Sequence, residues 1–229
     1  MLFLGRGDHP AFNTVQYLRL ASETIDATLA EVRALARDHG RHALTWEIAS
    51  TAAPPGLAER LLERGMRPAD PPLAVIMALG SPPPAPPPGI TVSRVATVAD
   101  FRTFVTVTHE VFGALDRLPA ELERIDREGA ADLAEPRFVR YLAWMDGAPV
   151  AAATAAFTPA GVMLHSGSTR PDWRGRGAYR ALVAARWEDA VRAGTPLAVT
   201  RAGAMSRPIL RQSGFTELAE IRFLEDRFG

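Results

Sequence analysis

Hydrophobic and polar residues alternate over residues 90–95, and apolar residues then recur at helical spacing over 98–113. Alternation with a period of two predicts a half-buried strand, whereas apolar residues three or four positions apart predict a helix with one buried face. A second and more polar helix is predicted over 119–135. This part of the chain therefore opens with a strand followed by two helices.

A hairpin is predicted next. Residues 138–145 are rich in aromatic and branched side chains, and the Asp146-Gly147 pair that follows is typical of a two-residue hairpin turn. Residues 149–157 form the second strand of the hairpin. Because this run is small and apolar with almost no polar alternation, it predicts a central strand that is covered on both faces.

The remaining pattern alternates strand, helix, strand, short helix and strand. These elements are predicted over residues 162–169, 177–193, 197–200, 206–213 and 215–223. Gly194 follows the long helix where a C-terminal cap is expected. From residue 90 onward the sequence therefore predicts an α/β fold with the element order β-α-α-β-β-β-α-β-α-β.

The first 80 residues show a shorter version of this ending. A helix that ends near Gly40 precedes a strand at 44–48, a helix at 56–65 and a strand at 73–79. This αβαβ order matches the last four elements of the chain and predicts a degenerate half-copy, in which Gly5-Arg6-Gly7 would be the remnant of a loop. The alternative is an unrelated αβαβ segment. As a copy, the segment would be an accessory domain without a second active site.

Residues 81–89, Ser-Pro-Pro-Pro-Ala-Pro-Pro-Pro-Gly, separate these two regions. Prolines at this density cannot join a helix or a strand ladder and favour an extended polyproline II spacer. The sequence therefore predicts an accessory domain at 1–80, a proline-rich linker at 81–89 and a catalytic domain at 90–229. A proline-rich surface loop inside one fold remains the alternative.

Composition narrows the function. The 229 residues carry 26 basic and 26 acidic side chains, so no net charge favours nucleic acid or an anionic membrane surface as a partner. The chain has no cysteine, which excludes disulfides, thiolate metal sites and cysteine nucleophiles. No apolar run is long enough to span a membrane. These features predict a cytoplasmic protein, for which a homodimer is left open.

The turn before the helix at 177–193 carries the strongest chemical signal. Gly175 and Gly177 permit a tight turn and a close approach of the backbone to a ligand. The helix that follows presents unpaired N–H groups and its positive dipole end, which bind anions. Positive charge is added by Arg174, Arg176 and Arg180. The segment therefore predicts a phosphate site, with a strand-to-helix turn that binds nothing as the alternative.

Two familiar phosphate motifs do not fit this turn. A dinucleotide fingerprint needs a third glycine where Arg180 stands and an acidic residue about twenty positions later, near Thr200 and Arg201. A mononucleotide P-loop ends in Gly-Lys-Ser or Gly-Lys-Thr, and no lysine is nearby. A nucleotide-binding domain of another kind is left as a weaker reading.

The loop resembles the pyrophosphate loop of the GCN5-related N-acetyltransferases, the GNAT family, whose pattern is Arg or Gln, two residues, Gly, one residue, and Gly or Ala. Arg174 and Gly177 match this pattern, and Tyr179 stands at its last position. The element order over 90–229 is similar to that of the family, as are the last helix and turn at 206–215. The resemblance implies a GNAT acyl-CoA N-acyltransferase fold, with a mixed and mostly antiparallel sheet flanked by helices and a smaller αβαβ half domain before it.

The resemblance also implies acetyl-CoA as cosubstrate, the primary amine of a small molecule as acceptor, and direct attack of the amine on the thioester, without a metal. Acetyl-CoA would bind at Gly167, Ser168, Thr169, Arg174, Gly175, Arg176, Gly177, Ala178, Tyr179 and Arg180. Backbone N–H groups of residues 167–169 would stabilise the oxyanion. A bulky residue in place of Gly177 is expected to abolish coenzyme A binding and to leave the fold intact.

Few side chains are candidates for proton transfer. His165 lies on the strand before the loop, and an ordinary histidine pKa near 6.5 suits a general base. The family commonly has a tyrosine as acid in the last helix, where this chain has Leu210, so Tyr179 and Ser206 are the substitute candidates. The missing tyrosine leaves a second function open, a catalytically weak CoA-binding sensor or regulatory module.

Carboxylates are concentrated between residues 114 and 128, namely Asp116, Glu121, Glu123, Asp126 and Glu128. Such a segment would attract a cationic amine acceptor. The alternative is an ordinary solvated helix face.

Overall fold

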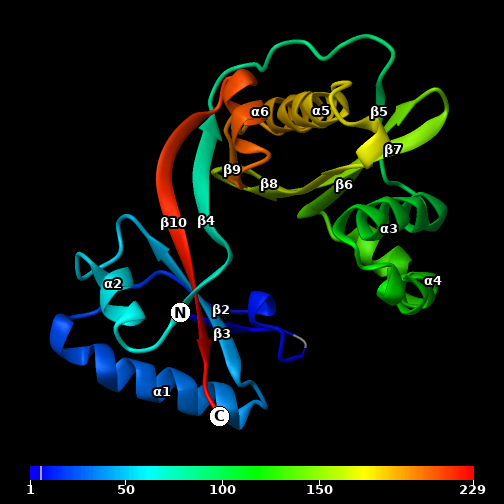
Figure 1. Cartoon of the computed structure of the whole chain (residues 1–229). Helices are drawn as coiled ribbons and strands as arrows, with labels where there is room; N and C mark the ends of the chain where they lie inside the picture. The colour runs from blue at the N-terminus through cyan, green and yellow to red at the C-terminus, as the bar shows by residue number, and fades with distance from the viewer. Residues whose placement is uncertain (6) are drawn as a thin grey trace. The chain divides into compact units, whose positions relative to one another are not determined.

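The computed structural model describes residues 1–5 and 7–229 (Figure 1). The chain forms two compact units. The first unit contains Met1–Ile76, Ala202–Arg207 and Glu217–Gly229, and the second contains Met77–Arg201 and Pro208–Thr216. Arg6 lies outside the described residues, so the interpretation of Gly5-Arg6-Gly7 as a loop remnant stays a prediction.

The strands of the second unit form a mixed and mostly antiparallel sheet, as the sequence predicts. They are β5 (Thr91–Arg94), β6 (Phe138–Met145), β7 (Ala148–Thr158), β8 (Gly161–Thr169) and β9 (Ala198–Ala202). Their order in the sheet is β9-β8-β7-β6-β5. Neighbours from β5 to β8 are antiparallel, and β9 is parallel to β8. The central position of β7 explains its apolar sequence, because helices cover both of its faces.

Helices α3 (Val98–Phe112) and α4 (Leu118–Ala134) cover one face of this sheet, and α5 (Ala178–Arg192) covers the other (Figure 1). A capping box begins α3, in which the Thr97 hydroxyl accepts from the Asp100 amide and the Asp100 carboxylate accepts from the Thr97 amide. The core between α3, α4 and the sheet consists of Val95, Phe101, Phe104, Val105, Val107, Ile125, Leu142 and Ala152. All the elements predicted for 90–201 are therefore present within one or two residues of their expected ends.

Polar contacts fix α5 on the sheet. Asp189 is 6% exposed, and its carboxylate accepts a hydrogen bond from the Tyr141 hydroxyl at 2.6 Å and from Arg94 Nε at 2.7 Å. Hydrogen bonding of this kind satisfies a buried carboxylate that would otherwise be costly. Tyr141 is 1% exposed and is a core residue of the second unit.

The first unit contains β1 (Leu2–Leu4), β2 (Asn13–Val15), β3 (Ala43–Ala49) and most of β10 (Thr216–Arg227), in the order β1-β2-β3-β10. Its core also includes α1 (Ile25–Asp38) and α2 (Leu57–Leu62), which pack on β3 through Leu44, Trp46 and Ile48. β3 and β10 pair along seven residues, from Ala49 opposite Ile221 to Ala43 opposite Arg227. Arg33 of α1 holds β10 through two hydrogen bonds to Asp226, at 2.9 and 2.7 Å.

The αβαβ order predicted for the first 80 residues is present. Its elements α1, β3, α2 and β4 (Arg67–Leu79) have the same order as α5, β9, α6 (Arg207–Gln212) and β10. Left-handed glycines follow the helices in both series, namely Gly40 and Gly65 in the first and Gly194 and Gly214 in the second. The strands β1 and β2 were not predicted, because each has only three residues and shows no pattern.

The two units differ from the predicted segments at the C-terminus. Glu217–Gly229 groups with the first unit rather than with most of the predicted catalytic segment, because β10 pairs with β3, and Ala202–Arg207 groups with the first unit as well. Residues 81–89 form no helix or strand and belong to the second unit, where Pro87 packs against Gly177. The catalytic and accessory roles of the segments stay predictions.

Candidate functional site

Strands β8 and β9 pair only briefly and then separate. Their three paired positions end at Leu164 and Thr200, where the Thr200 hydroxyl donates to Leu164 O at 3.0 Å. β8 continues to Thr169. From His165 onward, no residue in the described part of the chain pairs with the edge of β8 that faces β9. The backbone N–H and C=O groups on this edge are therefore left for other partners.

A β-bulge lies at the same place. Ala152 is opposite Ser168, whereas Thr154 is opposite His165, so β8 carries one residue more than β7 across this stretch. Ser166 has φ 49°, in the left-handed region that a non-glycine residue seldom adopts. Bulges re-aim the backbone and are frequent beside active sites. The bulge here turns the N–H groups near Gly167 out of the regular ladder.

The loop that follows β8 ends at the N-terminus of α5. Gly175 and Gly177 have φ 76° and 96°, conformations that glycine adopts at little cost. The first hydrogen bond of the helix runs from Ala181 N–H to Gly177 O at 3.0 Å, and no side chain caps the helix. The amides of the first three helical residues, 178–180, therefore have no helix carbonyl to which they can donate.

Positive charge surrounds these amides. Arg174 Nε donates to Thr169 O at 3.2 Å, and the Arg176 guanidinium lies over the Trp173 ring at 4.8 Å. Within the described residues, neither of these arginines nor Arg180 forms an ion pair. N–H donors, two flexible glycines and three unneutralised guanidinium groups fit a diphosphate. The loop residues of the sequence prediction are thus brought together by the structure.

Two side chains near the end of β8, Ser168 and Thr169, differ in whether they are available to contact a ligand. Ser168 is 3% exposed, and its hydroxyl donates to Ala152 O at 3.3 Å, so only its backbone remains for a ligand. The Thr169 hydroxyl oxygen is buried and has no hydrogen-bond partner within the described residues. A buried hydroxyl without a partner is costly, which makes Thr169 a natural contact for a polar ligand group.

Two of the glycines are in close contact with other side chains. A Cβ atom at Gly177 would lie 2.7 Å from both Cγ and Cδ of Pro87. The expectation that a bulky residue at 177 would leave the fold intact is therefore wrong, because both the left-handed backbone and Pro87 oppose it. A Cβ atom at Gly167 would lie 2.5 Å from Cε2 of Tyr179. At Gly175 a Cβ atom would meet nothing within 4 Å.

His165 lies at the point where β8 and β9 separate and is exposed to solvent. Partial burial of the ring lowers the pKa of His165, and the positive charges of Arg201 and Arg186 lower it further. The imidazole is therefore neutral at pH 7, which is the form that accepts a proton.

The candidates for the acid differ in their surroundings. Leu210, which stands where the resemblance implies a tyrosine, is fully buried. Ser206 groups with the first unit and its hydroxyl donates to Gly203 O at 3.4 Å, and its role as an acid stays a prediction. Burial raises the pKa of Tyr179, and the nearby Arg186 guanidinium opposes part of this rise. The Tyr179 phenol is thus protonated at neutral pH.

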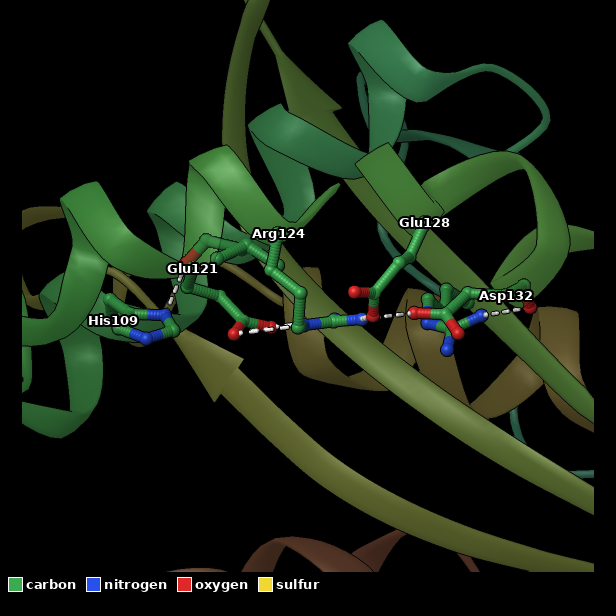
Figure 2. Close-up of polar contacts among 7 residues, drawn as sticks. His109, Glu121, Arg124, Glu128 and Asp132 are labelled. Carbon is green, nitrogen blue, oxygen red and sulfur yellow. Dashed lines mark hydrogen bonds and ion pairs between the residues drawn. The ribbon is translucent and has the colours of Figure 1, made fainter. Parts of the chain in front are cut away.

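The acidic segment is largely paired within the chain. Figure 2 shows Arg124 of α4 among three carboxylates, at 2.8 Å from Glu121, 3.6 Å from Glu128 and 2.7 Å from Asp132. The hydrogen bond to Glu121, which has the largest effect, and the one to Asp132 raise the pKa of Arg124. Asp126 pairs with Arg102 at 2.6 Å. Arg124 and Arg102 offset part of the negative charge of the segment, and the attraction for a cationic amine acceptor stays a prediction beside the helix-face alternative.

Two further findings concern partners. No helix within residues 1–5 and 7–229 is both long and apolar enough to cross a membrane. In the same residues, no group of three or more histidine, aspartate or glutamate side chains is arranged to hold a metal ion.

Comparison with solved structures shows that the chain has the fold of the GCN5-related N-acetyltransferases. A GCN5-related N-acetyltransferase from Kribbella flavida is similar over 100% of this chain and 86% of its own, with a TM-score of 0.76 and 21% identity. One from Sphaerobacter thermophilus is similar over 90% of this chain and 69% of its own, with a TM-score of 0.67 and 23% identity. Comparisons with protein-family models and with curated sequences found no match.

A tandem GNAT protein from the clavulanic acid biosynthesis pathway, in a structure without AcCoA, is similar over 92% of this chain and 72% of its own, with a TM-score of 0.67 and 19% identity. Residues 90–229 alone make up well under 92% of the chain. The likeness to a tandem protein therefore includes the N-terminal segment, as expected for a GNAT-like half domain.

Sequence reasoning missed two features of this site. Arg186 is 1% exposed, and its guanidinium donates to Leu182 O at 2.9 Å and to Thr154 O at 3.3 Å, beside the bulge. An arginine on the apolar face of the predicted helix was the available signal. The contact between Tyr179 and Gly167 could not be predicted, because no pattern in the sequence links these two positions.

Proposed function

We propose that this protein transfers an acyl group from acyl-CoA to an amine, with acetyl-CoA as donor and the primary amine of a small molecule as acceptor. One arrangement carries this proposal. The N-terminus of α5 is uncapped and has three arginines nearby that form no ion pair within the described residues. Tyr179 in its first turn contacts Gly167 of β8, in the part of the strand that has separated from β9. A diphosphate and an extended pantetheine arm need these two features side by side.

In this proposal the donor is held by backbone more than by side chains. The N–H groups of residues 175–180 and the guanidinium groups of Arg174, Arg176 and Arg180 bind the diphosphate, and Thr169 contacts the arm that follows. The freed edge of β8 hydrogen-bonds the pantetheine amides in place of a neighbouring strand. N–H groups at the bulge near Gly167 then stabilise the negative charge on the thioester oxygen during the reaction.

The reaction requires one proton to leave the amine and one to reach the leaving thiolate. The amine nitrogen attacks the thioester carbon, a C–N bond forms, and the C–S bond breaks with its electron pair going to sulfur. His165 removes a proton from the amine nitrogen, because its ring is neutral at pH 7. Tyr179, protonated at neutral pH, is the proposed donor of a proton to sulfur.

Replacing His165 with Gln should lower kcat/KM about 100-fold or more, because the general base is lost. In the parent protein kcat/KM should fall as the pH drops below the ordinary histidine range, since burial and two arginines lower the pKa of His165. In the variant this fall in kcat/KM at acidic pH should disappear, and the pH dependence that comes from protonation of the amine substrate should remain. The pH profile of kcat/KM checks both statements. A profile identical to that of the parent would remove His165 from the mechanism.

The exposed His39 in the first unit provides the matched control, since among the described residues its ring hydrogen-bonds only to Leu35 O, at 2.9 Å. The His39→Gln variant should keep both the rate and the pH profile. A loss in this variant equal to that in His165→Gln would mean that the effect is general instability.

Mass spectrometry of a panel of small primary amines incubated with acetyl-CoA and the full chain should detect at least one product heavier by one acetyl group. A second candidate, a CoA-binding sensor, is favoured by Leu210, a fully buried residue where the resemblance implies a catalytic tyrosine. Tight CoA binding with slow hydrolysis and no acetylated amine would support the sensor. Absence of CoA binding by calorimetry would contradict both functions.

We also propose that the first unit is an accessory part without its own active site. Its α1 begins after a 3₁₀ turn at Ser22–Thr24, without the glycine loop that precedes α5. The donor is expected to bind with a stoichiometry of one per chain.

A further inference from the structure

In the contact between Tyr179 and Gly167, a large aromatic ring packs on a residue that has no side chain. Tyr179 occupies the loop position at which the resemblance implies glycine or alanine, in the first turn of α5. Its ring extends to β8 and lies so close to Gly167 that a Cβ atom there would be 2.5 Å from Cε2, 3.3 Å from Cδ2 and 3.5 Å from Cζ. The ring therefore takes the space that a side chain at 167 would otherwise fill.

A side chain at position 167 would meet the Tyr179 ring first. Gly175 and Gly177 have left-handed backbone, with φ 76° and 96°, but Gly167 has none of this strain. The three heavy atoms nearest to a Cβ at 167 all belong to Tyr179. The absence of a side chain at Gly167 thus makes room for the large side chain of Tyr179.

The Tyr179 ring is held at both ends. Its backbone is fixed in α5, and its hydroxyl lies beside the Arg186 guanidinium, which is 1% exposed and anchored to Leu182 O and Thr154 O. A ring that lies beside a buried guanidinium group acts as a wall, since moving it would expose that group. The wall stands at the bulge of β8, where the proposed function places the thioester carbonyl.

We infer that Tyr179 determines which acyl donors the site accepts, and that its ring, packed on Gly167 at the bulge, restricts the donor to a short acyl group such as acetyl. This inference rests on the proposed function. A longer acyl chain attached to the same carbonyl needs space beyond Gly167, and on the α5 side of β8 the ring already fills that space. Interiors are packed too tightly for an extra chain to enter without displacing a side chain.

The test measures binding and turnover of a series of acyl-CoAs, namely acetyl-, propionyl-, butyryl- and hexanoyl-CoA, with the full chain. The parent should prefer acetyl-CoA to hexanoyl-CoA at least tenfold. Tyr179→Ala should shift this ratio at least tenfold toward hexanoyl-CoA, because each methylene that it can bury strengthens binding about fourfold. An unchanged ratio in a folded Tyr179→Ala variant, or equal use of both donors by the parent, would overturn the inference.

Two further variants separate the wall from other roles of Tyr179. Tyr179→Phe keeps the ring and removes the hydroxyl, so it should keep the chain-length preference even if it lowers the rate through loss of the proton donor. A Phe variant that accepts hexanoyl-CoA would contradict the wall. Tyr179→Leu is smaller than the parent and still fills part of the core, and it replaces Tyr179→Ala if that variant does not fold. It should accept butyryl-CoA.

The outcome also separates this inference from the function on which it rests. If calorimetry shows that the parent chain binds neither CoA nor any acyl-CoA, both the proposed function and the inference are wrong. If the parent binds acetyl-CoA and the variants keep its preference for short acyl groups, only the role of Tyr179 is wrong and the proposed function is unaffected.

Discussion

Replacing Gly175 with Asp should weaken binding of coenzyme A about 30-fold or more. The carboxylate would lie beside the uncapped amides of α5, where the proposed diphosphate binds. Two like charges about 4 Å apart repel each other by about 1 kcal/mol in bulk water and by about 4 kcal/mol near a protein surface. The backbone tolerates the change. Gly175 has φ 76°, which Asp and Asn adopt more readily than other residues, and no atom lies within 4 Å of a Cβ atom there.

Gly175→Asn is the matched control, because it has the same shape and the same backbone strain but no charge. Its affinity for coenzyme A should stay within about threefold of the parent value, and the difference between the two variants should shrink as salt is added. Calorimetry with coenzyme A at two salt concentrations measures both effects. Equal weakening by Asp and Asn would show that the loop does not bind a phosphate group.

Gly175 is a better probe of this loop than Gly177, and only the structure reveals the difference. The sequence marks both glycines as turn residues that approach a ligand. Pro87, however, packs on Gly177 from a proline-rich segment ninety residues earlier in the chain. A substitution at 177 would disturb this packing and the loop together. Long-range contacts of this kind leave no local pattern, because neither residue changes the periodicity of its own neighbourhood.

Local patterns predicted the second unit well for a physical reason. The apolar run of β7 and the Asp146-Gly147 turn each depend on near neighbours, and the structure has the strand at Ala148–Thr158 and left-handed backbone at both turn residues. The glycine-arginine loop was predicted for the same reason, since an anion site at a helix N-terminus is built from consecutive residues. Sequence spacing therefore located the proposed donor site before any contact was known.

The C-terminal strand shows where such reasoning ends. Its alternation predicts a strand but does not say which strand it pairs with. Seven residues of β10 pair with β3 near the start of the chain, and Asp226 is held by Arg33. As a result the last residues group with the first unit. Pairing between distant segments depends on the total burial achieved, and no single segment encodes it.

Replacing Gly167 with Ala should lower kcat/KM for acetyl-CoA about 10- to 100-fold, although the change adds only one methyl group. The new Cβ would lie 2.5 Å from Tyr179 Cε2, so either the ring or the bulge must move. The ring lies between Gly167 and the buried Arg186, and the bulge is therefore expected to shift and to misplace the N–H groups that the proposal assigns to the oxyanion. Misplacement by about 1 Å is enough to cost up to 100-fold in rate.

Removing the ring should reverse this loss. In the double variant Gly167→Ala with Tyr179→Ala the clash is absent, so its kcat/KM for acetyl-CoA should lie within about threefold of that of Tyr179→Ala alone. The coupling between the two positions, taken from the four rates, is then about 1 to 2 kcal/mol in favour of the double variant. Because Gly167 has no left-handed strain, its backbone conformation is open to alanine. Losses that simply add would mean that Gly167 is required by the ligand itself, and that Tyr179 is only its neighbour.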